Sequence, residues 1–173
     1  MAITLVLGGT RSGKSEVAES LAAGVGGRVT YVATGYPSDA DMGARIAAHR
    51  ARRPASWTTL EAGADLPQTL AAVDGTAVVD SLGAWVAAHP DLAPDAASLC
   101  RALGGRAADT IVVSEEVGLG VHAATAAGRR FADALGELNR AVAELADEVL
   151  LVVAGRVLPL SRPGRRGPLE PTD

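Results

Sequence analysis

The sequence has little cysteine and few aromatic residues, and both shortages exclude something. Cys100 is the only cysteine among 173 residues, so no disulfide can form within the chain. It falls in a predicted helix, where we expect it to be packed rather than reactive. Aromatic residues make up 3% of the chain, so the core must be built from the alanine, valine and leucine within its 48% apolar fraction.

Two further absences concern membranes and nucleic acids. No apolar run approaches the roughly 20 residues that a transmembrane helix needs, and no secretory signal precedes the first motif. We therefore expect a cytoplasmic protein without a transmembrane segment. The formal net charge of −4 argues against a nucleic-acid partner bound through a broad basic face, but not against a small anion.

Lysine is the scarcest basic residue, and its one occurrence is informative. Lys14 is the only lysine in a chain that otherwise uses arginine. A lysine ammonium is a slim point charge suited to reaching a phosphate. Lys14 lies in a P-loop pattern made of Gly8, Gly9, Thr10, Arg11, Ser12, Gly13, Lys14 and Ser15.

The P-loop pattern has a physical basis in each of its positions. Its glycines let backbone N–H groups cradle the β-phosphate, its lysine bridges β- and γ-oxygens, and its hydroxyl holds Mg²⁺. The partial positive charge of a following helix N-terminus adds to the attraction. We therefore predict that all eight residues bind a nucleoside triphosphate, with Lys14 catalytic and Ser15 on Mg²⁺.

Apolar β-branched runs alternate with helical patterns along the chain. The runs predict strands at 3–7, 29–33, 57–60, 77–79, 110–113 and 149–153, with an edge strand at 157–160. Apolar periodicity predicts helices at 14–23, from 38 or 39 to about 52, and at 66–73, 82–88, 95–103 and 125–146. This alternation is typical of an α/β fold, a mainly parallel sheet with helices on both faces.

The domain organisation follows from the same pattern and from the composition of the C-terminal end. We expect a single nucleotide-binding catalytic domain over residues 1–160. Residues 161–173 are rich in proline, glycine and arginine, a composition typical of a disordered tail.

Magnesium at a P-loop also needs an outer carboxylate, usually at the end of an apolar strand. Asp80 follows the predicted strand 77–79 and is the first candidate. Glu115 and Glu116 follow the strand 110–113 and are the other, with Glu116 the weaker ligand in our prediction. Alternatively, one of these positions merely caps the helix that follows.

Basic residues crowd the predicted helix that ends near residue 52. Arg45, His49 and Arg53 recur at a spacing of four, and therefore share one helix face, with Arg50 close by. Such a face can grip a triphosphate, and His49 can act as ligand, acid, base or nucleophile. A solvated basic helix surface is the alternative. His89 and His122 fall in loops without a comparable setting.

Several further segments form a recurring set together with the P-loop. They are Tyr31-Val32-Ala33-Thr34; Asp41-Met42, Arg45-Ile46, His49-Arg50, Arg53-Pro54, Trp57, Thr59 and Glu61; Asp80-Ser81-Leu82 with Trp85; Val113-Ser114-Glu115-Glu116-Val117-Gly118 with Gly120; Arg129-Arg130-Phe131, Asp133, Gly136 and Asn139; and residues 146–149 and 153–155. The set resembles the bifunctional adenosylcobinamide kinase / adenosylcobinamide-phosphate guanylyltransferase family of cobalamin biosynthesis, over about residues 3–160.

This resemblance implies a RecA-like P-loop NTPase fold, a homotrimer, Mg²⁺ as cofactor and GTP and ATP as substrates. The implied reactions are phosphorylation of the aminopropanol hydroxyl of adenosylcobinamide, and transfer of GMP from GTP onto that phosphate. His49 would carry the covalent GMP. The nucleotide-binding residues implied beyond the P-loop are Arg45, Arg50, Arg53, Glu61 and Asp80.

The sequence departs from the family pattern at three positions: Glu115 stands in place of a more typical Asn, Ser81 of a Cys and Ala123 of a Pro. A carboxylate at position 115 adds negative charge near the phosphates.

Two other functions stay open on the residues alone. One is a P-loop kinase for a small metabolite, which forms no covalent nucleotide. The other is a nucleotide-dependent regulatory NTPase, in which hydrolysis is a switch.

Overall fold

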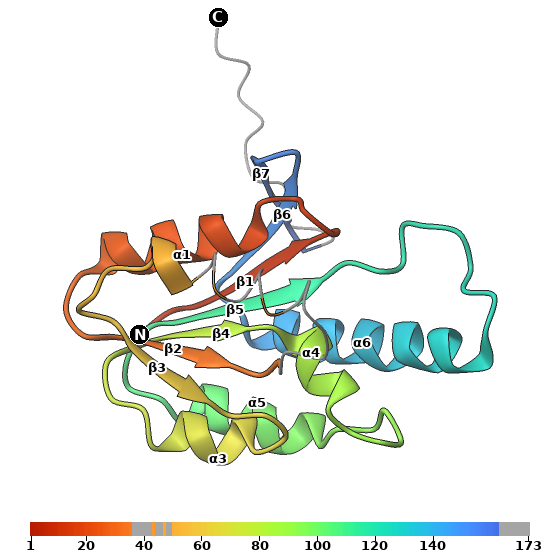
Figure 1. Cartoon of the computed structure of the whole chain (residues 1–173), viewed down its shortest axis with the longest axis horizontal. Helices are drawn as coiled ribbons and strands as arrows, with labels where there is room; N and C mark the ends of the chain where they lie inside the picture. The colour runs from red at the N-terminus through yellow and green to blue at the C-terminus, as the bar shows by residue number, and fades with distance from the viewer. Residues whose placement is uncertain (36–42, 44–46, 48–49, 163–173) are drawn as a thin grey trace, which may run out of the picture.

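A seven-stranded sheet forms the centre of the molecule (Figure 1). The computed structural model describes residues 1–35, 43, 47 and 50–162. The spatial strand order is β3-β2-β4-β5-β1-β6-β7, with every neighbouring pair parallel except the antiparallel β6 and β7. The strands are β1 (Ile3–Gly8), β2 (Val29–Ala33), β3 (Thr58–Glu61), β4 (Thr76–Asp80), β5 (Thr110–Glu115), β6 (Glu148–Val153) and β7 (Arg156–Pro159).

Helices cover both faces of this sheet, as predicted (Figure 1). One face is covered by α1 (Lys14–Val25), which packs against β1, β4 and β5. The opposite face is covered by α3 (Leu66–Ala71), α4 (Leu82–Ala87), α5 (Ala96–Gly104) and α6 (Ala126–Leu145). The α/β fold with a mainly parallel sheet is confirmed.

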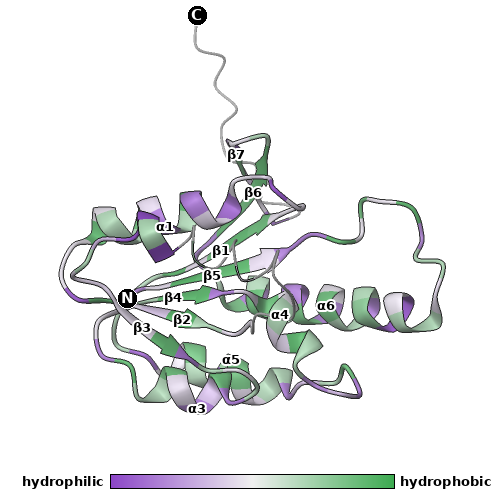
Figure 2. Ribbon diagram, viewed as in Figure 1, coloured by the Kyte–Doolittle hydropathy of each residue, from purple (hydrophilic) through white to green (hydrophobic). Residues whose placement is uncertain are grey.

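The central strands are buried on both faces, and alternate side chains serve two cores. Leu5 belongs to the core under α3 to α6, while its neighbour Val6 packs with Ala18 of α1. Because successive strand side chains point to opposite faces, a strand buried on both sides is apolar without interruption. Figure 2 shows this as hydrophobic colour along the central strands.

Helix α1 packs through its smallest residues. Ala18 and Ala22 are fully buried, whereas Val17 and Leu21, which carry the predicted apolar spacing, are only partly buried. Small side chains let the helix approach the sheet closely, and the larger pair lies at the flank of the contact. The predicted helix is therefore confirmed, but its buried stripe lies one residue further along.

Most predicted elements are found within a few residues of their expected bounds. The main difference is β5, which extends two residues beyond its predicted end and so contains Glu115. Of the predicted helix from residue 38 or 39 to 52, only part is described, and 50–52 are helical there. Residues 163–173 of the predicted tail lie outside the described residues.

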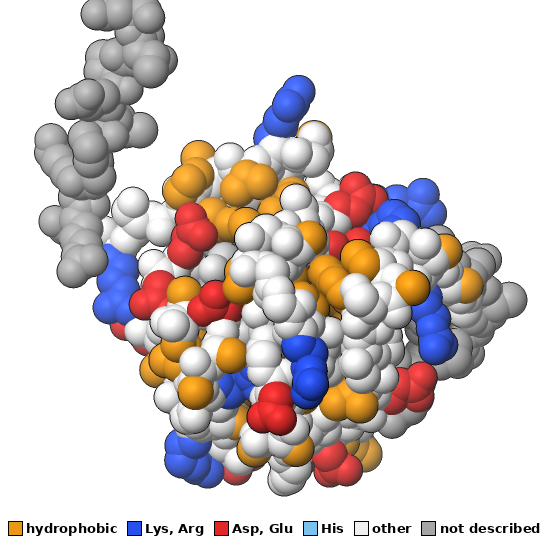
Figure 3. All heavy atoms as spheres, turned by 90° about the vertical axis from the view of Figure 1, so that its left-hand side faces the viewer, with side chains coloured by type: hydrophobic (Ala, Val, Ile, Leu, Met, Phe, Trp, Pro, Cys, Tyr) orange, Lys and Arg blue, Asp and Glu red, His pale blue; other side chains and the backbone are white. Residues whose placement is uncertain are grey.

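The amino-terminal ends of the parallel strands lie to the left in Figure 1. Figure 3 views the molecule from that side, where acidic and basic side chains are interspersed. In open parallel sheets, ligands bind at the opposite edge, outside the carboxyl ends of the strands.

Within the described part of the chain, no helix combines the length and apolar character needed to cross a membrane.

Candidate functional site

The strand order brings three predicted site segments to one edge of the sheet. β1 ends at Gly8, where the P-loop begins, and its register partner on β5 is Glu115. β4 follows on the other side of β5 and ends at Asp80. The P-loop and two of the candidate carboxylates therefore meet at the carboxyl ends of adjacent strands, although about 100 residues separate Gly8 from Glu115 in the chain.

The P-loop conformation depends on its glycines. A Cβ on Gly8 would lie 2.4 Å from the Ser12 hydroxyl and 2.8 Å from the Val152 carbonyl oxygen, so only glycine fits there. Gly13 has φ 96°, a left-handed conformation that favours glycine, and it precedes α1 without a side-chain cap. The first turn of α1 thus presents its N–H groups to an anion.

A buried hydroxyl inside the loop is a further feature that suits an anion site. Ser12 Oγ is buried and has no hydrogen-bond partner within the described residues. The backbone of Ser12 is held by the β6–β7 turn, since Gly155 N–H donates to the Ser12 carbonyl at 2.8 Å. A buried polar atom without a partner costs about 1–3 kcal/mol, and a phosphate oxygen can supply that partner.

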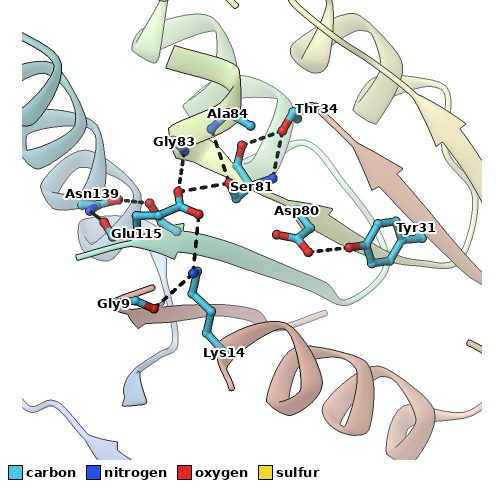
Figure 4. Close-up of polar contacts among 11 residues, drawn as sticks. Gly9, Lys14, Tyr31, Thr34, Asp80, Ser81, Gly83, Ala84, Glu115 and Asn139 are labelled. Carbon is cyan, nitrogen blue, oxygen red and sulfur yellow. Dashed lines mark hydrogen bonds and ion pairs between the residues drawn. The ribbon is translucent and has the colours of Figure 1, made fainter. Parts of the chain in front are cut away.

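Lys14 extends from the loop toward the end of β5 (Figure 4). Its Nζ lies 3.4 Å from the Gly9 carbonyl oxygen and 3.6 Å from Glu115 Oε1. The ammonium group therefore lies at the carboxyl edge of the sheet, and in P-loop proteins such a lysine typically contacts the β- and γ-phosphates.

Asp80 is oriented by a tyrosine from the neighbouring strand. The Tyr31 hydroxyl on β2 donates a short hydrogen bond to Asp80 Oδ2 (Figure 4). Burial raises the pKa of Tyr31 above its usual range, and the adjacent Asp80 carboxylate raises it further. Tyr31 therefore stays a hydrogen-bond donor at any working pH, and the second oxygen of Asp80 is left for another ligand.

Arg53 joins this pair from the other end. Its guanidinium carbon lies 3.7 Å from the centre of the Tyr31 ring, and its Nη1 donates to Thr59 Oγ1 at 3.2 Å. A cation stacked on an aromatic face is held in position. Arg53 thus forms one connected group with Tyr31 of β2 and Asp80 of β4, the strand next to β5.

A second network fixes Glu115. Its Oε2 accepts hydrogen bonds from the Ser81 hydroxyl and from Gly83 N–H, both at 3.0 Å (Figure 4). Ser81 is held in turn by Thr34, whose hydroxyl donates to the Ser81 carbonyl at 2.6 Å and accepts from Ser81 N–H at 2.8 Å. The carboxylate is therefore positioned by elements β2, β4 and α4.

The backbone at the end of β5 is tied to α6. Asn139 accepts from the Ser114 hydroxyl at 2.6 Å and donates to the Glu115 carbonyl oxygen at 3.1 Å. The next residue, Glu116, turns its carboxylate to its own loop and accepts from Gly118 N–H at 2.6 Å. Of the two glutamates, Glu115 is therefore the one that contacts Lys14.

The basic segment is described only in part. Arg45 and His49 lie outside the described residues, and Arg50 is exposed. Arg52 lies 3.1 Å from Glu16 and 3.5 Å from Glu19 of α1. Together with Arg53 on Tyr31, this contact holds the described end of the segment against the P-loop helix and β2.

Glu61 lies far from the other predicted nucleotide ligands. It is exposed at the end of the edge strand β3, and three strands separate β3 from β1. At about 4.8 Å between strands, the two strands lie about 19 Å apart. Glu61 therefore belongs to the same edge of the sheet, but not to the surroundings of Lys14.

A preformed multidentate metal site is not found in the described ranges, where no three His, Cys, Asp or Glu side chains come together. Mg²⁺ at a P-loop does not need one, because phosphates and water supply most of its ligands. The Ser15 hydroxyl and the Asp80 carboxylate both offer oxygen, the donor that Mg²⁺ prefers.

His89, His122 and Cys100, to which the sequence assigned no catalytic role, all lie within the described residues. His89 Nδ1 lies 2.8 Å from the Trp85 carbonyl oxygen, and its ring meets the Trp85 ring edge-on. His122 is exposed. Cys100 is half-buried, and burial raises the pKa of its thiol, which disfavours the reactive thiolate.

Sequence reasoning assigned no role to the groups that position Asp80 and Glu115. Tyr31, Ser81 and the Gly83 N–H bind a carboxylate directly, while Thr34 holds Ser81 and Asn139 holds the backbone of Glu115. All five lie within or beside segments that carry the family resemblance, or follow them directly. That position is a signal of importance, but only the strand order reveals which carboxylate each one serves.

Comparisons with known proteins agree with this geometry. A family described as "Cobinamide kinase / cobinamide phosphate guanyltransferase" matches residues 4–160. The bifunctional adenosylcobalamin biosynthesis protein CobP of Pseudomonas aeruginosa is 43% identical, over 90% of this chain and 95% of that protein. The corresponding CobU of Salmonella typhimurium is 35% identical, over 87% and 95%.

A similar solved structure is an ATPase from the type III secretion system of pathogenic bacteria. Its TM-score is 0.62, over 87% of this chain and 50% of that chain. At 13% sequence identity this likeness shows the fold alone. The described sheet and P-loop are those of a P-loop NTPase, as the sequence predicted.

Proposed function

The chain belongs to the cobinamide kinase / cobinamide phosphate guanyltransferase family, and we propose that a single triphosphate site at its P-loop serves both reactions. It is an enzyme of cobalamin biosynthesis, a kinase and a guanylyltransferase. The observation that carries the proposal is the position of Lys14, which reaches the carboxyl edge of the sheet within 3.6 Å of Glu115.

The P-loop residues bind the phosphates in this proposal. Backbone N–H groups from Gly8 to Ser15 surround the β-phosphate, and Lys14 stabilises charge on the β- and γ-oxygens. The partnerless hydroxyl of Ser12 and the uncapped first turn of α1 support this binding mode. ATP and GTP are both proposed as substrates, because the phosphate contacts do not read the base.

Ser15 and Asp80 are the proposed Mg²⁺ ligands, with Glu116 a weaker candidate. When bound there, Mg²⁺ neutralises charge on the β- and γ-phosphates. Asp80 fits the role because Tyr31 occupies only one of its carboxylate oxygens. Glu116 fits less well because its Oε1 accepts a hydrogen bond from Gly118 within its own loop.

His49 is the proposed nucleophile of guanylyl transfer. Its imidazole nitrogen attacks the α-phosphorus of GTP, the bond to the bridging oxygen breaks, and pyrophosphate leaves. A phosphate oxygen of the acceptor then displaces the imidazole, which forms the diphosphate product and frees His49. Arg45, Arg50 and Arg53 neutralise the developing charge in this proposal.

The described contacts of the neighbouring arginines support this assignment. His49 is four residues from Arg53 in sequence, so their Cα atoms lie within about 14 Å of each other in any conformation. Arg53 is stacked on Tyr31, whose hydroxyl binds Asp80. We therefore propose that His49 reaches the phosphate site. Glu61, at the far end of the same edge, is proposed to contact a part of the nucleotide remote from the phosphates.

The acceptor is proposed to be adenosylcobinamide, a corrinoid whose aminopropanol hydroxyl is phosphorylated first. We further propose a homotrimer located in the cytoplasm, where nucleoside triphosphates are made. The domain is proposed to span residues 1–160, with a tail over 161–173.

Labelling of the chain tests the covalent mechanism. The protein is incubated with Mg²⁺ and GTP labelled on the α-phosphate and then denatured. We expect acid-labile, alkali-stable label on the wild-type chain, none on His49→Ala, and undiminished label on His122→Ala, which changes an exposed histidine. Label that persists in His49→Ala would contradict the assignment. Kinase turnover without any label would favour a kinase that forms no covalent nucleotide.

A further inference from the structure

Glu115 is held in place by donors that fix one of its two oxygens. Oε2 accepts from the Ser81 hydroxyl and from Gly83 N–H, each at 3.0 Å. Ser81 Oγ in turn accepts from Ala84 N–H at 3.3 Å, which orients its hydroxyl toward Glu115. A Cβ on Gly83 would lie 2.1 Å from Oε2, so only glycine allows this approach. The carboxylate is therefore preorganised before any ligand arrives.

The other oxygen of Glu115 faces the phosphate site (Figure 4). Oε1 lies 3.6 Å from Lys14 Nζ, the group that meets the γ-phosphate, and 29% of the Glu115 side chain is exposed. A hydroxyl that attacks the γ-phosphorus approaches it to about 3–3.5 Å. Because Lys14 meets the γ-phosphate of a triphosphate bound in a P-loop, Oε1 borders the space in which such an acceptor hydroxyl would approach.

The other two carboxylates beside the P-loop are less suited to receive a proton. Asp80 accepts a hydrogen bond from Tyr31, and it is already proposed as a ligand of Mg²⁺. Glu116 accepts a hydrogen bond from Gly118 N–H within its own loop. Glu115 makes the only ion pair with Lys14 within the described ranges, and it does so through the oxygen that Ser81 and Gly83 do not bind.

We propose that Glu115 is a catalytic residue of the phosphoryl transfer, the base that accepts the proton of the acceptor hydroxyl. This inference rests on the proposed function of the P-loop as a kinase site. A carboxylate beside a γ-phosphate is repelled by the phosphate oxygens, so its favourable role there is to receive a proton. Lys14 offsets the repulsion.

The step balances in atoms and charge. The acceptor oxygen forms a bond to the γ-phosphorus as its proton passes to Glu115 Oε1. The bond from the γ-phosphorus to the β–γ bridging oxygen breaks, and the electron pair stays on the β-phosphate, next to Lys14. The proton then leaves Glu115 for water. Guanylyl transfer does not need this base, because its acceptor is a phosphate oxygen that is already ionised.

The Asn of the family pattern at this position differs in one respect. An amide oxygen accepts a hydrogen bond from the hydroxyl but does not take up its proton at neutral pH. Glu115 therefore adds proton acceptance at the position that faces the acceptor in this proposal.

The test compares the two half reactions in Glu115→Gln, which keeps an oxygen for Ser81 and Gly83. We expect the kcat of the kinase step to fall about 100-fold, the low end for loss of a general base, while the KM for triphosphate changes little. Covalent labelling by α-labelled GTP should continue at the wild-type rate. Glu137→Gln, the same change at an exposed site on α6, should leave both half reactions unchanged.

Glu115→Asp separates proton acceptance from a structural role, because it keeps a carboxylate. We expect its kinase kcat to exceed that of Glu115→Gln, and a kcat no higher than that of Glu115→Gln would contradict proton acceptance by Glu115.

Undiminished kinase turnover in Glu115→Gln, or equal loss of kinase turnover and labelling, would overturn the role of Glu115 alone. Absence of kinase turnover in the wild type would overturn the proposed kinase site, and this inference with it.

Discussion

At the scale of single residues, the site depends on side chains that orient other side chains. Tyr31 donates to Asp80 and carries Arg53 on its ring. Ser81 and Gly83 hold Glu115. Each carboxylate is therefore positioned by donors from a neighbouring element, which reduces the reorganisation needed when substrates bind.

Tyr31→Phe tests the orientation of Asp80. The variant removes the hydroxyl but keeps the ring on which Arg53 stacks. Since loss of such a supporting hydrogen bond typically weakens metal binding 10–100-fold, we expect the Mg²⁺ concentration for half-maximal turnover to rise about 10-fold, with turnover recovered at high Mg²⁺. A Mg²⁺ titration of both half reactions measures this. An unchanged titration would mean that Tyr31 does not orient a metal ligand.

At the scale of elements, one buried arginine joins two loops at the opposite edge of the sheet. Arg106, between α5 and β5, donates to the carbonyl oxygens of Leu70 and Val73 at 2.8 Å and of Gly75 at 2.6 Å. Its Nε also donates to Thr110 Oγ1 at 2.8 Å. The α3–β4 connection is thus anchored to the start of β5, the strand that ends at Glu115.

Arg106→Ala should therefore destabilise the fold. The variant leaves buried carbonyl groups without donors, and we expect the free energy of unfolding to fall by about 3 kcal/mol. Arg101→Ala, an exposed arginine one turn away on α5, should change it by less than about 0.5 kcal/mol. Urea denaturation of the two variants makes the comparison. Equal stabilities would show that the carbonyls find other partners.

The P-loop helix links the site to the basic segment. Arg52 pairs with Glu16 and Glu19 in the first half of α1, the helix that begins at Lys14. The described end of the basic segment is thereby held against the helix that follows the P-loop. These pairs are partly exposed, so each contributes at most about 1 kcal/mol; their effect is on position rather than on stability.

At the scale of the whole molecule, the proposed triphosphate site draws on elements from both faces of the sheet. The P-loop connects β1 to α1, while Glu115 and Ser81 belong to strands and turns that support α4 and α6. A ligand that contacts Lys14 therefore stabilises the described domain as a unit.

Thermal unfolding measures that coupling. At 100 times its Kd, Mg²⁺–GTP stabilises the folded state by about 2.7 kcal/mol, and we expect the Tm to rise by about 5–10 °C. Lys14→Ala removes a charge-assisted contact of about 1.5–3 kcal/mol, so the same GTP concentration should give little shift. A full shift in Lys14→Ala would remove the P-loop lysine from triphosphate binding.

Much of this arrangement could be predicted from local sequence. The P-loop is a contiguous pattern of eight residues, and each β-branched run forms a strand near its expected place. Asp80 was identified as a candidate because a carboxylate ended an apolar strand. The partner of Lys14 could not be identified in this way, since Asp80, Glu115 and Glu116 all satisfy the same local rule.

The sequence by itself determined the chemistry available to this protein: one lysine in a glycine-rich loop, a buried parallel sheet and carboxylates at strand ends. The tertiary structure alone decided how these groups meet. It inserts β5 between β1 and β4, so Glu115 rather than Asp80 contacts Lys14, and it places Tyr31 beside Asp80. The physical reason is that helix and strand formation follow local periodicity, whereas strand order depends on packing between segments far apart in the chain.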